Sequence, residues 1–122
     1  MRVLLVDDEL ELVTTMAERL SIRGIDADWV LNAEDALQKV ETNQYDVAVL
    51  DVKIPKGCGI RLKKELEQKV PGMKFIFVTG HGSEADFRAG CLEAGAAYYL
   101  VKPVDLSDLV QKMEKVTQEK GE

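Results

Sequence analysis

The sequence predicts an α/β protein, a doubly wound parallel sheet built from five successive βα units. Short apolar runs alternate along the chain with segments of helical spacing, and four of the five runs are nearly unbroken in apolar character, as strands covered on both faces are. Residues that cap helices stand at the boundaries. Because parallel strands are joined by right-handed crossovers, this alternation places helices on both faces of the sheet.

The strands are predicted from five short β-rich runs. In chain order, the runs are Val3–Val6, Ala27–Val30, Val47–Leu50, Phe75–Val78 and Ala97–Val101.

Each run is followed by a segment in which apolar residues recur at helical spacing, which predicts five amphipathic helices. Their apolar stripes are Leu10, Val13, Ala17 and Leu20; Ala33, Ala36, Leu37 and Val40; Leu62, Leu66 and Val70; Phe87, Cys91 and Ala94; and Leu106, Leu109, Val110, Met113 and Val116. The helix boundaries have their own signals. Asn32, Ser83 and Asp105 are expected to cap helix N-termini, each with an acid three residues later, and Gly24 and Gly95 to end helices.

Composition limits the classes of function. A chain of 122 residues forms one domain with a packed core, and a net charge of −6 without a cluster of Lys and Arg argues against direct nucleic-acid binding. No apolar run approaches the roughly 20 residues that cross a bilayer, and no signal-peptide pattern precedes the first strand. We therefore expect a cytoplasmic protein that makes no membrane contact. Cys58 and Cys91 lack CxxC spacing and are expected to be reduced thiols.

The residues that follow the strands are unusually polar. Asp7 and Asp8 follow the first strand, Asp51 ends the third, Thr79 the fourth and Lys102 the fifth. In open parallel sheets, ligands bind beyond the carboxyl ends of the strands. Three carboxylates, a hydroxyl and an ammonium are therefore expected to converge.

Each of these residues also has a simpler explanation when taken alone. Asp8 could cap the first helix, with Glu11 completing a capping-box-like pattern. Asp51 could be a turn residue, Thr79 a strand-end residue with β propensity, and Lys102 a solvated surface amine.

Taken together, the residues form a consistent electrostatic design. Clustered carboxylates repel one another, and a single lysine cannot fully neutralise three of them. A divalent cation would supply the missing charge. A ligand set of oxygen atoms, without paired His or Cys, favours Mg²⁺ over zinc.

Several motifs in a fixed order resemble the receiver domains of two-component response regulators. They are Val6-Asp7-Asp8-Glu9, Asp51 followed by Pro55 and Gly59, Thr79-Gly80, and Tyr99-Leu100-Val101-Lys102-Pro103. The resemblance covers essentially the whole chain, so residues 1–122 are expected to form one receiver domain, similar to the single-domain chemotaxis regulator. It implies a flavodoxin-like fold with strand order 2-1-3-4-5, in which the second strand lies at an edge.

The resemblance also implies a chemistry. A histidine kinase or phosphotransfer protein would donate a phosphoryl group to Asp51. Mg²⁺ would be bound by Asp8 and Asp51 directly, by Asp7 through water, and by the backbone carbonyl of Lys53. Lys102 would pair with a phosphoryl oxygen. The domain would be a signalling switch that catalyses only its own phosphorylation and dephosphorylation, and not an enzyme acting on other substrates.

The same resemblance implies how the signal leaves the site. The Thr79 hydroxyl would bind the phosphoryl group, and Tyr99 would move into the space that the threonine vacates. The region from Glu84 to Val116 would then contact an unidentified downstream protein or a second copy of the chain. In similar receivers, a cis bond before Pro103 aims the lysine.

Several residues near Asp51 and Thr79 leave the rate of phosphoryl hydrolysis and the choice of partner open. Lys53 and His81 stand where receivers tend to control hydrolysis, although an exposed, non-catalytic His81 is the favoured interpretation. Cys58 replaces a residue that is usually acidic in receivers, and Lys53 and Lys56 make the loop after Asp51 basic. These departures concern hydrolysis rate and partner choice, and they leave the phosphoacceptor residues intact.

Three other functions compete with the receiver interpretation. A phosphatase of the haloacid-dehalogenase type also uses an aspartyl nucleophile with Mg²⁺, but needs a second Asp where Lys53 stands. A nucleotide or flavin carrier needs a phosphate-binding loop after the first strand, where the acidic pair Asp7-Asp8 would repel phosphate. A scaffold that has kept the fold and lost the switch would fail to respond to a phosphoryl mimic.

Overall fold

The computed structural model describes residues 1–54, 57–80 and 98–118, which form a parallel sheet flanked by helices. The elements are β1 (Arg2–Val6), α1 (Leu10–Ile22), β2 (Asp26–Val30), α2 (Ala33–Thr42), β3 (Val47–Asp51), β4 (Lys53–Ile54), β5 (Gly57–Cys58), α3 (Gly59–Lys69), β6 (Lys74–Thr79), β7 (Tyr98–Val101) and α5 (Leu106–Gln118). No helix within these ranges is long and apolar enough to cross a bilayer.

The order of the five main strands is β2-β1-β3-β6-β7, and all neighbouring pairs are parallel. This confirms the predicted order 2-1-3-4-5, with β2 at an edge. Each predicted run lies within the observed strand, except that Ala97 is outside the described residues. The structure adds a short antiparallel ribbon, β4–β5, in the loop after β3.

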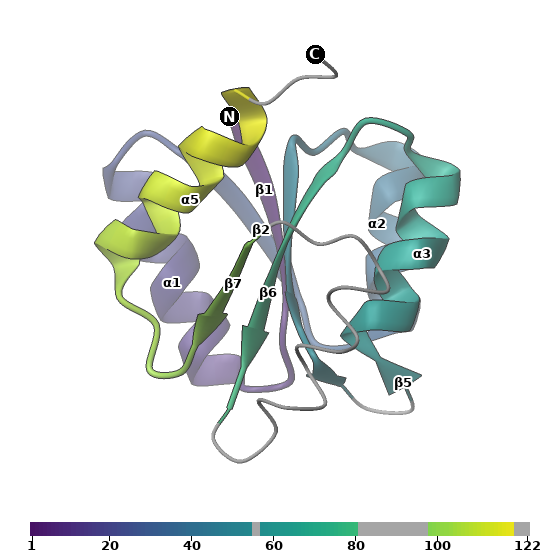
Figure 1. Cartoon of the computed structure of the whole chain (residues 1–122), viewed down its shortest axis with the longest axis horizontal. Helices are drawn as coiled ribbons and strands as arrows, with labels where there is room; N and C mark the ends of the chain where they lie inside the picture. Colours follow the sequence, from purple (N-terminus) through teal and green to yellow (C-terminus); the bar gives the residue numbers. More distant parts are fainter. Residues whose placement is uncertain (55–56, 81–97, 119–122) are drawn as a thin grey trace.

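Strand register brings the carboxyl ends of four strands together. Val6 lies beside Leu50, Asp51 beside Val78, and Thr79 beside Val101. The arrowheads of β6 and β7 point to the lower edge of the sheet in Figure 1. The polar residues that follow the strands therefore lie together at the carboxyl ends of the strands.

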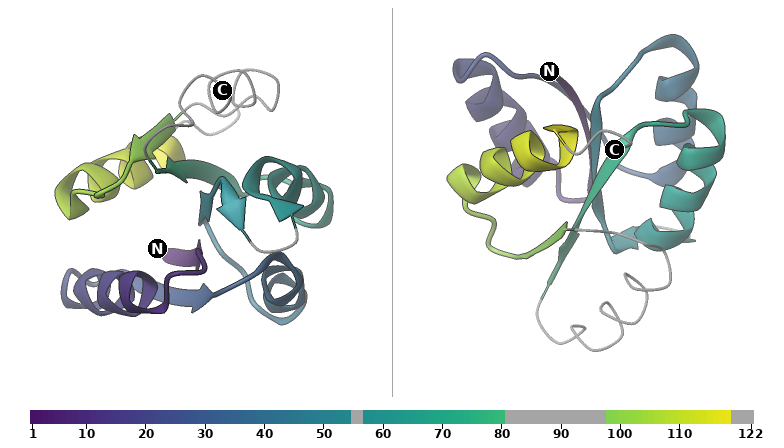
Figure 2. Two further views of the ribbon diagram at one scale, coloured as in Figure 1. Left: turned by 90° about the horizontal axis from the view of Figure 1, so that it is seen from below. Right: turned by 45° about the horizontal axis from the view of Figure 1, so that its top comes forward.

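The sheet separates two cores, one on each face. Helices α1 and α5 cover one face, and α2 and α3 cover the other (Figures 1 and 2). Alternate residues of β1 point in opposite directions: Val3 and Leu5 pack with α1 and α5, and Leu4 and Val6 pack on the other side. Because β1, β3 and β6 are buried on both faces, they need the nearly unbroken apolar sequences from which they were predicted.

Local signals fix several helix ends. Gly24 has φ +81°, and hydrogen bonds from Gly24 N to Ser21 O (2.9 Å) and from Ile25 N to Leu20 O (2.9 Å) close α1 in a Schellman pattern. The Asn32 side chain accepts a hydrogen bond from Asp35 N at 2.8 Å, and Asp105 Oδ1 accepts one from Ser107 N at 2.8 Å. These three predictions are confirmed. Ser83, Gly95 and the predicted fourth helix lie outside the described residues.

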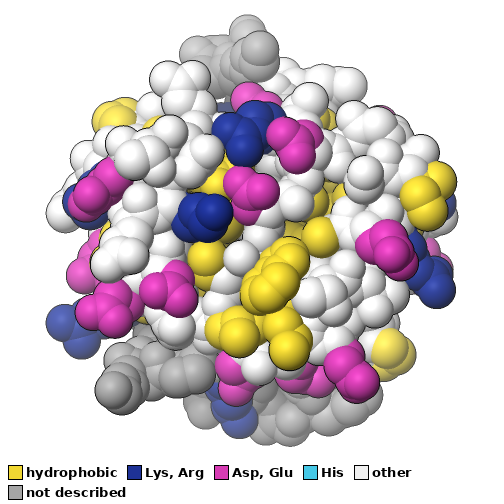
Figure 3. Space-filling model, turned by 180° about the vertical axis from the view of Figure 1, so that it is seen from behind, with side chains coloured by type: hydrophobic (Ala, Val, Ile, Leu, Met, Phe, Trp, Pro, Cys, Tyr) yellow, Lys and Arg dark blue, Asp and Glu magenta, His cyan; other side chains and the backbone are white. Residues whose placement is uncertain are grey.

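Most residues of the edge strand β2 are exposed or half-buried, and only Val30 is buried. Figure 3 shows the molecule from behind, where hydrophobic side chains gather near the centre of the face among acidic and basic groups. Trp29 of β2 is 37% exposed. The polar residues in this run are therefore explained by its position at the edge.

Candidate functional site

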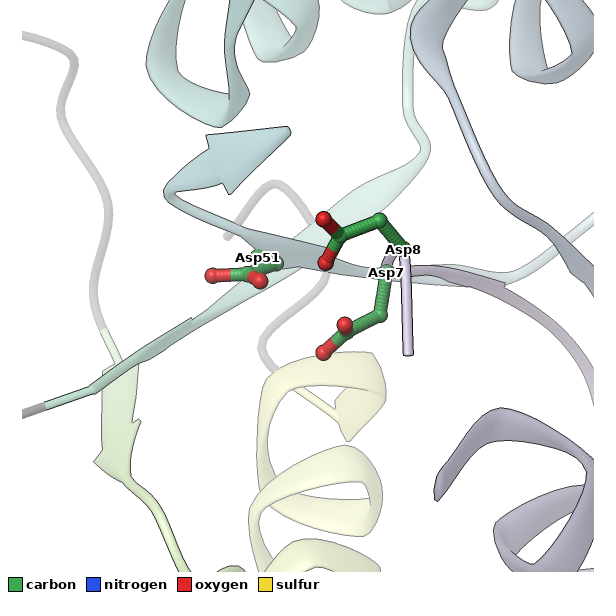
Figure 4. A group of neighbouring side chains, drawn as sticks. All are labelled: Asp7, Asp8 and Asp51. Atoms are coloured by element: carbon green, nitrogen blue, oxygen red, sulfur yellow. The ribbon is translucent and has the colours of Figure 1, made fainter. Parts of the chain in front are cut away.

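Three aspartates meet beyond the carboxyl ends of β1 and β3. Asp7 and Asp8 follow β1, and Asp51 is the last residue of β3. One carboxylate oxygen from each lies within 4.8 Å of the others, and Figure 4 shows the three side chains extending into the same region. Asp7 and Asp51 are each only 6% exposed, whereas Asp8 is open to solvent. The predicted convergence of carboxylates is confirmed.

Backbone groups hold the two buried carboxylates in place. Asp7 Oδ1 accepts a hydrogen bond from Glu9 N at 2.9 Å, and Asp51 Oδ1 accepts one from Lys53 N at 3.2 Å. Each bond spans two residues, as in an Asx turn. The turns after β1 and β3 therefore direct these side chains toward one site.

The alternative that Asp8 caps the first helix is wrong. Helix α1 begins at Leu10, Glu9 occupies the N-cap position, and no side chain makes a capping hydrogen bond there. The Asp8 carboxylate instead belongs to the cluster with Asp7 and Asp51.

Lys102 reaches into the cluster from the loop that follows β7. Its Nζ lies 2.9 Å from Asp7 Oδ2 and 3.3 Å from Asp51 Oδ2, and it also donates a hydrogen bond to Glu9 Oε1. The Lys102 side chain is 19% exposed, so the alternative of a solvated surface amine is wrong. The peptide bond between Lys102 and Pro103 is cis.

Glu9 is the residue of this site that the sequence reasoning missed. It belongs to the motif Val6-Asp7-Asp8-Glu9, but the sequence alone assigns it no role. Its contact with Lys102 joins residues separated by 93 positions. The available signal was its position directly after Asp7-Asp8, at the carboxyl end of a buried strand.

Burial and neighbouring charges shift the pKa values of the central pair. Burial raises the pKa of Asp51, the charge of Asp7 raises it further, and Lys102 offsets only part of the effect. Burial alone would lower the pKa of Lys102, but hydrogen bonds to Glu9 and Asp7 and the charge of Asp51 outweigh it, so the net shift is upward. Lys102 is therefore charged at neutral pH.

The start of α3 packs directly against the backbone of Asp51. A Cβ atom on Gly59 would lie 2.3 Å from the Asp51 carbonyl oxygen and 3.3 Å from Val52 Cα, and Gly59 N donates a hydrogen bond to Val52 O at 2.8 Å. Only a glycine allows this approach. Gly59 thus fixes the loop after β3, which carries Lys53, against the site.

The ligand set fits a hard divalent cation. The site gathers the carboxylates of Asp7, Asp8, Asp51 and Glu9 around one ammonium group, an excess of three negative charges when all are ionised. The donors of the aspartate cluster are all carboxylate oxygens, the ligand type that Mg²⁺ prefers, and exposed Asp8 leaves the cluster open to solvent.

Other predicted residues are placed only in part. Thr79 ends β6 beside Val101, but its side chain lies outside the described part of the chain. Tyr99 is 37% exposed in β7, next to Phe77. Cys58 lies in β5 without a described side chain. His81 and Cys91, and with them Pro55 and Lys56, lie outside the described residues.

The fold and the site define an α/β domain with a doubly wound parallel sheet, whose acidic cluster and lysine lie at the carboxyl ends of the strands, where open sheets of this kind bind their ligands. The family model of the response regulator receiver domain matches residues 3–114. A CheY-like response regulator receiver domain protein from Methanospirillum hungatei JF-1 has 32% identity and a TM-score of 0.88, covering 97% of this chain and 94% of that one.

Curated relatives agree with this match. The alkaline phosphatase synthesis transcriptional regulatory protein PhoP of Bacillus subtilis (strain 168) is 38% identical over 102 residues, which is 84% of this chain and 42% of that protein. A CpxR homolog from Haemophilus influenzae is 34% identical over 115 residues, 94% of this chain and 49% of that protein. The chain spans about half the length of the curated relatives it matches.

The chain belongs to the response regulator receiver domain family. Receiver domains are signalling modules of two-component systems, and their general function is to be phosphorylated on an aspartate.

Proposed function

We propose that this chain accepts a phosphoryl group on Asp51 in a Mg²⁺-dependent reaction. The observation that carries the proposal is the position of the Asp51 carboxylate, which lies with Asp7 and Asp8 in one cluster and 3.3 Å from the Lys102 ammonium. Asp51 is also the aspartate at the end of the central strand β3. A nucleophilic carboxylate, a ligand set for a cation and a fixed positive charge thus meet at one point.

In the transfer, an Asp51 carboxylate oxygen forms a bond to phosphorus as the bond between phosphorus and the donor breaks. The donor is the phosphohistidine of a histidine kinase or of a phosphotransfer protein, and its imidazole leaves with the electron pair. Such transfers depend mainly on positioning and charge neutralisation. The protein would therefore catalyse only its own phosphorylation and, with water as the acceptor, its own dephosphorylation.

We assign the Mg²⁺ ligands to the carboxylates of Asp8 and Asp51 and to the backbone carbonyl of Lys53, with Asp7 acting through water. The bound ion would supply positive charge for the phosphoryl oxygens. Exposed Asp8 can exchange water for a cation readily, and buried Asp7 is held by Glu9 N and Lys102.

Lys102 and Thr79 would bind the transferred group. Lys102 Nζ already lies beside Asp51 and can pair with a phosphoryl oxygen. The Thr79 hydroxyl would bind a second oxygen from the end of β6, next to β3. Tyr99 would then change its exposure as the switch moves, since it lies on β7, the strand beside β6.

The partner surface is proposed to run from Glu84 to Val116, which includes β7 and most of α5. It would bind a downstream protein or a second copy of the chain when Asp51 is phosphorylated. We expect no direct contact with nucleic acid, because the chain carries a net charge of −6, and none with membrane, because no apolar run of the sequence approaches the roughly 20 residues that cross a bilayer.

The proposal is tested by adding acetyl phosphate with Mg²⁺ to the wild type and to Asp51→Asn and measuring the intact mass. We expect one phosphoryl group on the wild type, none on the variant, and none on either protein in EDTA. If the wild type gains no adduct and does not bind beryllofluoride, the scaffold interpretation is correct. Continuous release of phosphate from unrelated phosphomonoesters would instead favour a phosphatase.

A further inference from the structure

The outer edge of strand β2 is open to a further strand. Among the described residues, β2 pairs only with β1, and it lies at the margin of the sheet between α1 and α2 (Figures 1 and 2). Asp7 N donates a hydrogen bond to Val30 O at 3.3 Å, so Val30 directs its backbone groups toward the sheet. Because these directions alternate along a strand, Ala27, Trp29 and Leu31 direct their backbone groups outward.

The same three residues form an apolar strip along this edge. Ala27 and Leu31 pack at the margin of the core beneath α1 and α5, and Trp29, on the same face of the strand, is 37% exposed. Open edges of sheets are usually protected by charged side chains. An open edge that carries an apolar strip is instead suited to the addition of another strand.

The strip is complementary to itself. If a second copy pairs antiparallel about a two-fold axis at Trp29, this residue lies opposite the partner's Trp29, and Ala27 lies opposite the partner's Leu31. Apolar and aromatic cross-strand pairs stabilise a sheet. On the other face, Asp28 lies opposite the partner's Val30. Registers centred on Ala27 or Asp28 would oppose acidic residues, so charge selects the register centred on Trp29.

A groove beside this edge has charges that match under the same symmetry. The groove has a volume of about 360 Å³ and lies between β2 and α2, lined by Trp29, Val30, Leu31, Asp35, Gln38 and Lys39. Lys39 forms no ion pair with any other described residue. Since the axis reverses the direction of α2, the partner's Lys39 would face Asp35, and the partner's Asp35 would face Lys39. A two-fold interface contains each such pair twice.

We propose that this chain forms a two-fold symmetric dimer by antiparallel pairing of its β2 edges, which joins two five-stranded sheets into one continuous sheet. The occupant of the edge is a second copy, because one surface supplies the complement of both its apolar strip and its charged groove. This interface is separate from the region between Glu84 and Val116. It needs no phosphoryl group and does not rest on the proposed function.

The test is sedimentation equilibrium of the unphosphorylated protein in EDTA and about 0.15 M salt, which screens the repulsion between the acidic chains. We expect a concentration-dependent dimer. Asp35→Lys and Lys39→Asp each oppose like charges twice and should raise the dimer Kd by about fivefold to thirtyfold, and the double variant should restore it. The two single changes shift the net charge in opposite directions, so weakening by both excludes general repulsion.

Glu34→Lys is the matched control. Glu34 is exposed and lies in the same helix turn as Asp35, but on the flank that faces α3, where Glu41 pairs with Lys69. This variant should dimerise at least as tightly as the wild type. Far-UV circular dichroism checks that each variant is folded.

A second measurement reports the strand pairing itself. At concentrations that favour the dimer, the amides of Ala27, Trp29 and Leu31 should gain protection from hydrogen exchange relative to that of Val30, which is directed toward β1. A protein that stays monomeric at about 1 mM would overturn the inference, as would a dimer that neither single reversal weakens or that protects none of these amides. Dimerisation only after phosphorylation would also overturn it and would favour the region between Glu84 and Val116.

Discussion

Asp51 is a carboxyl group whose surroundings oppose its ionised form. It is 6% exposed and lies beside Asp7, and Lys102 supplies only part of the compensation. A buried carboxylate of this kind lowers the stability of the fold, and binding of a cation would recover what is lost.

Because the surroundings of Asp51 oppose its ionised form, we predict that Asp51→Asn stabilises the metal-free protein at neutral pH, by on the order of 1 kcal/mol. The pKa of Asp51 is raised in the folded protein, so its contribution to stability is fully present below the ordinary pKa of an aspartate and is lost as pH rises through the raised value. The difference in free energy of unfolding between Asp51→Asn and the wild type should therefore become smaller toward about pH 4. Urea unfolding in EDTA measures this difference, and a variant less stable than the wild type at neutral pH would contradict the account.

Lys102 has the opposite role, because it is the cation shared by Asp7, Asp51 and Glu9. Lys102→Met should destabilise the metal-free protein by about 1–3 kcal/mol, since it leaves buried carboxylates without a counter-charge. Added Mg²⁺ should restore most of the loss. Lys64→Met, at an exposed position of α3, is the matched control and should stay within about 0.5 kcal/mol of the wild type. Equal stability of both variants would show that Lys102 does not neutralise the cluster.

At the scale of elements, the turn from β3 into α3 connects the fold to the site. Gly59 lets α3 begin against the Asp51 carbonyl, where a Cβ atom would lie at 2.3 Å. The clash is with backbone atoms, which cannot rotate away as a side chain can. The position of Asp51 therefore depends on a residue eight places further along the chain.

Gly59→Ala should destabilise the protein by about 1–3 kcal/mol and weaken Mg²⁺ binding, because the loop that carries Lys53 must shift. Gly80→Ala is the control, since a Cβ atom there meets nothing within 4 Å. Urea unfolding and a Mg²⁺ titration of both variants provide the comparison. If Gly59→Ala matches Gly80→Ala in both measurements, the close approach does not constrain the site.

The elements also show what could be predicted from the sequence. Strands β1, β3 and β6 are buried on both faces, so their apolar runs identified them, and local turn chemistry located the ends of helices at Gly24, Asn32 and Asp105. The β4–β5 ribbon was missed because strands of two residues have no readable periodicity. The position of Glu9 after Asp7-Asp8 places it near the site, but its contact with Lys102 was missed because the two residues are 93 positions apart and no local pattern pairs them.

For the molecule as a whole, the charged residues at the two ends of the strands differ in their arrangement. At the end of the sheet where the strands begin, Arg2 pairs with Asp26 and Asp28 at 3.1 Å each, and Tyr45 donates a hydrogen bond to Asp28 at 2.6 Å. Burial and this bond raise the pKa of Tyr45. These opposite charges are paired, which is typical of a structural role. At the carboxyl ends of the strands, four carboxylates share one ammonium, a larger excess of negative charge than that of two aspartates around Arg2, and this excess is suited to a cation.

The central claim is that Asp51 is the acceptor among the clustered carboxylates, and its most direct test is to locate the phosphoryl group. The protein is phosphorylated with acetyl phosphate and Mg²⁺, reduced with borohydride, which converts an aspartyl phosphate to homoserine, and sequenced by tandem mass spectrometry. The account predicts homoserine at position 51, with Asp7 and Asp8 unchanged. Homoserine at position 7 or 8, or at none of the three, would contradict it.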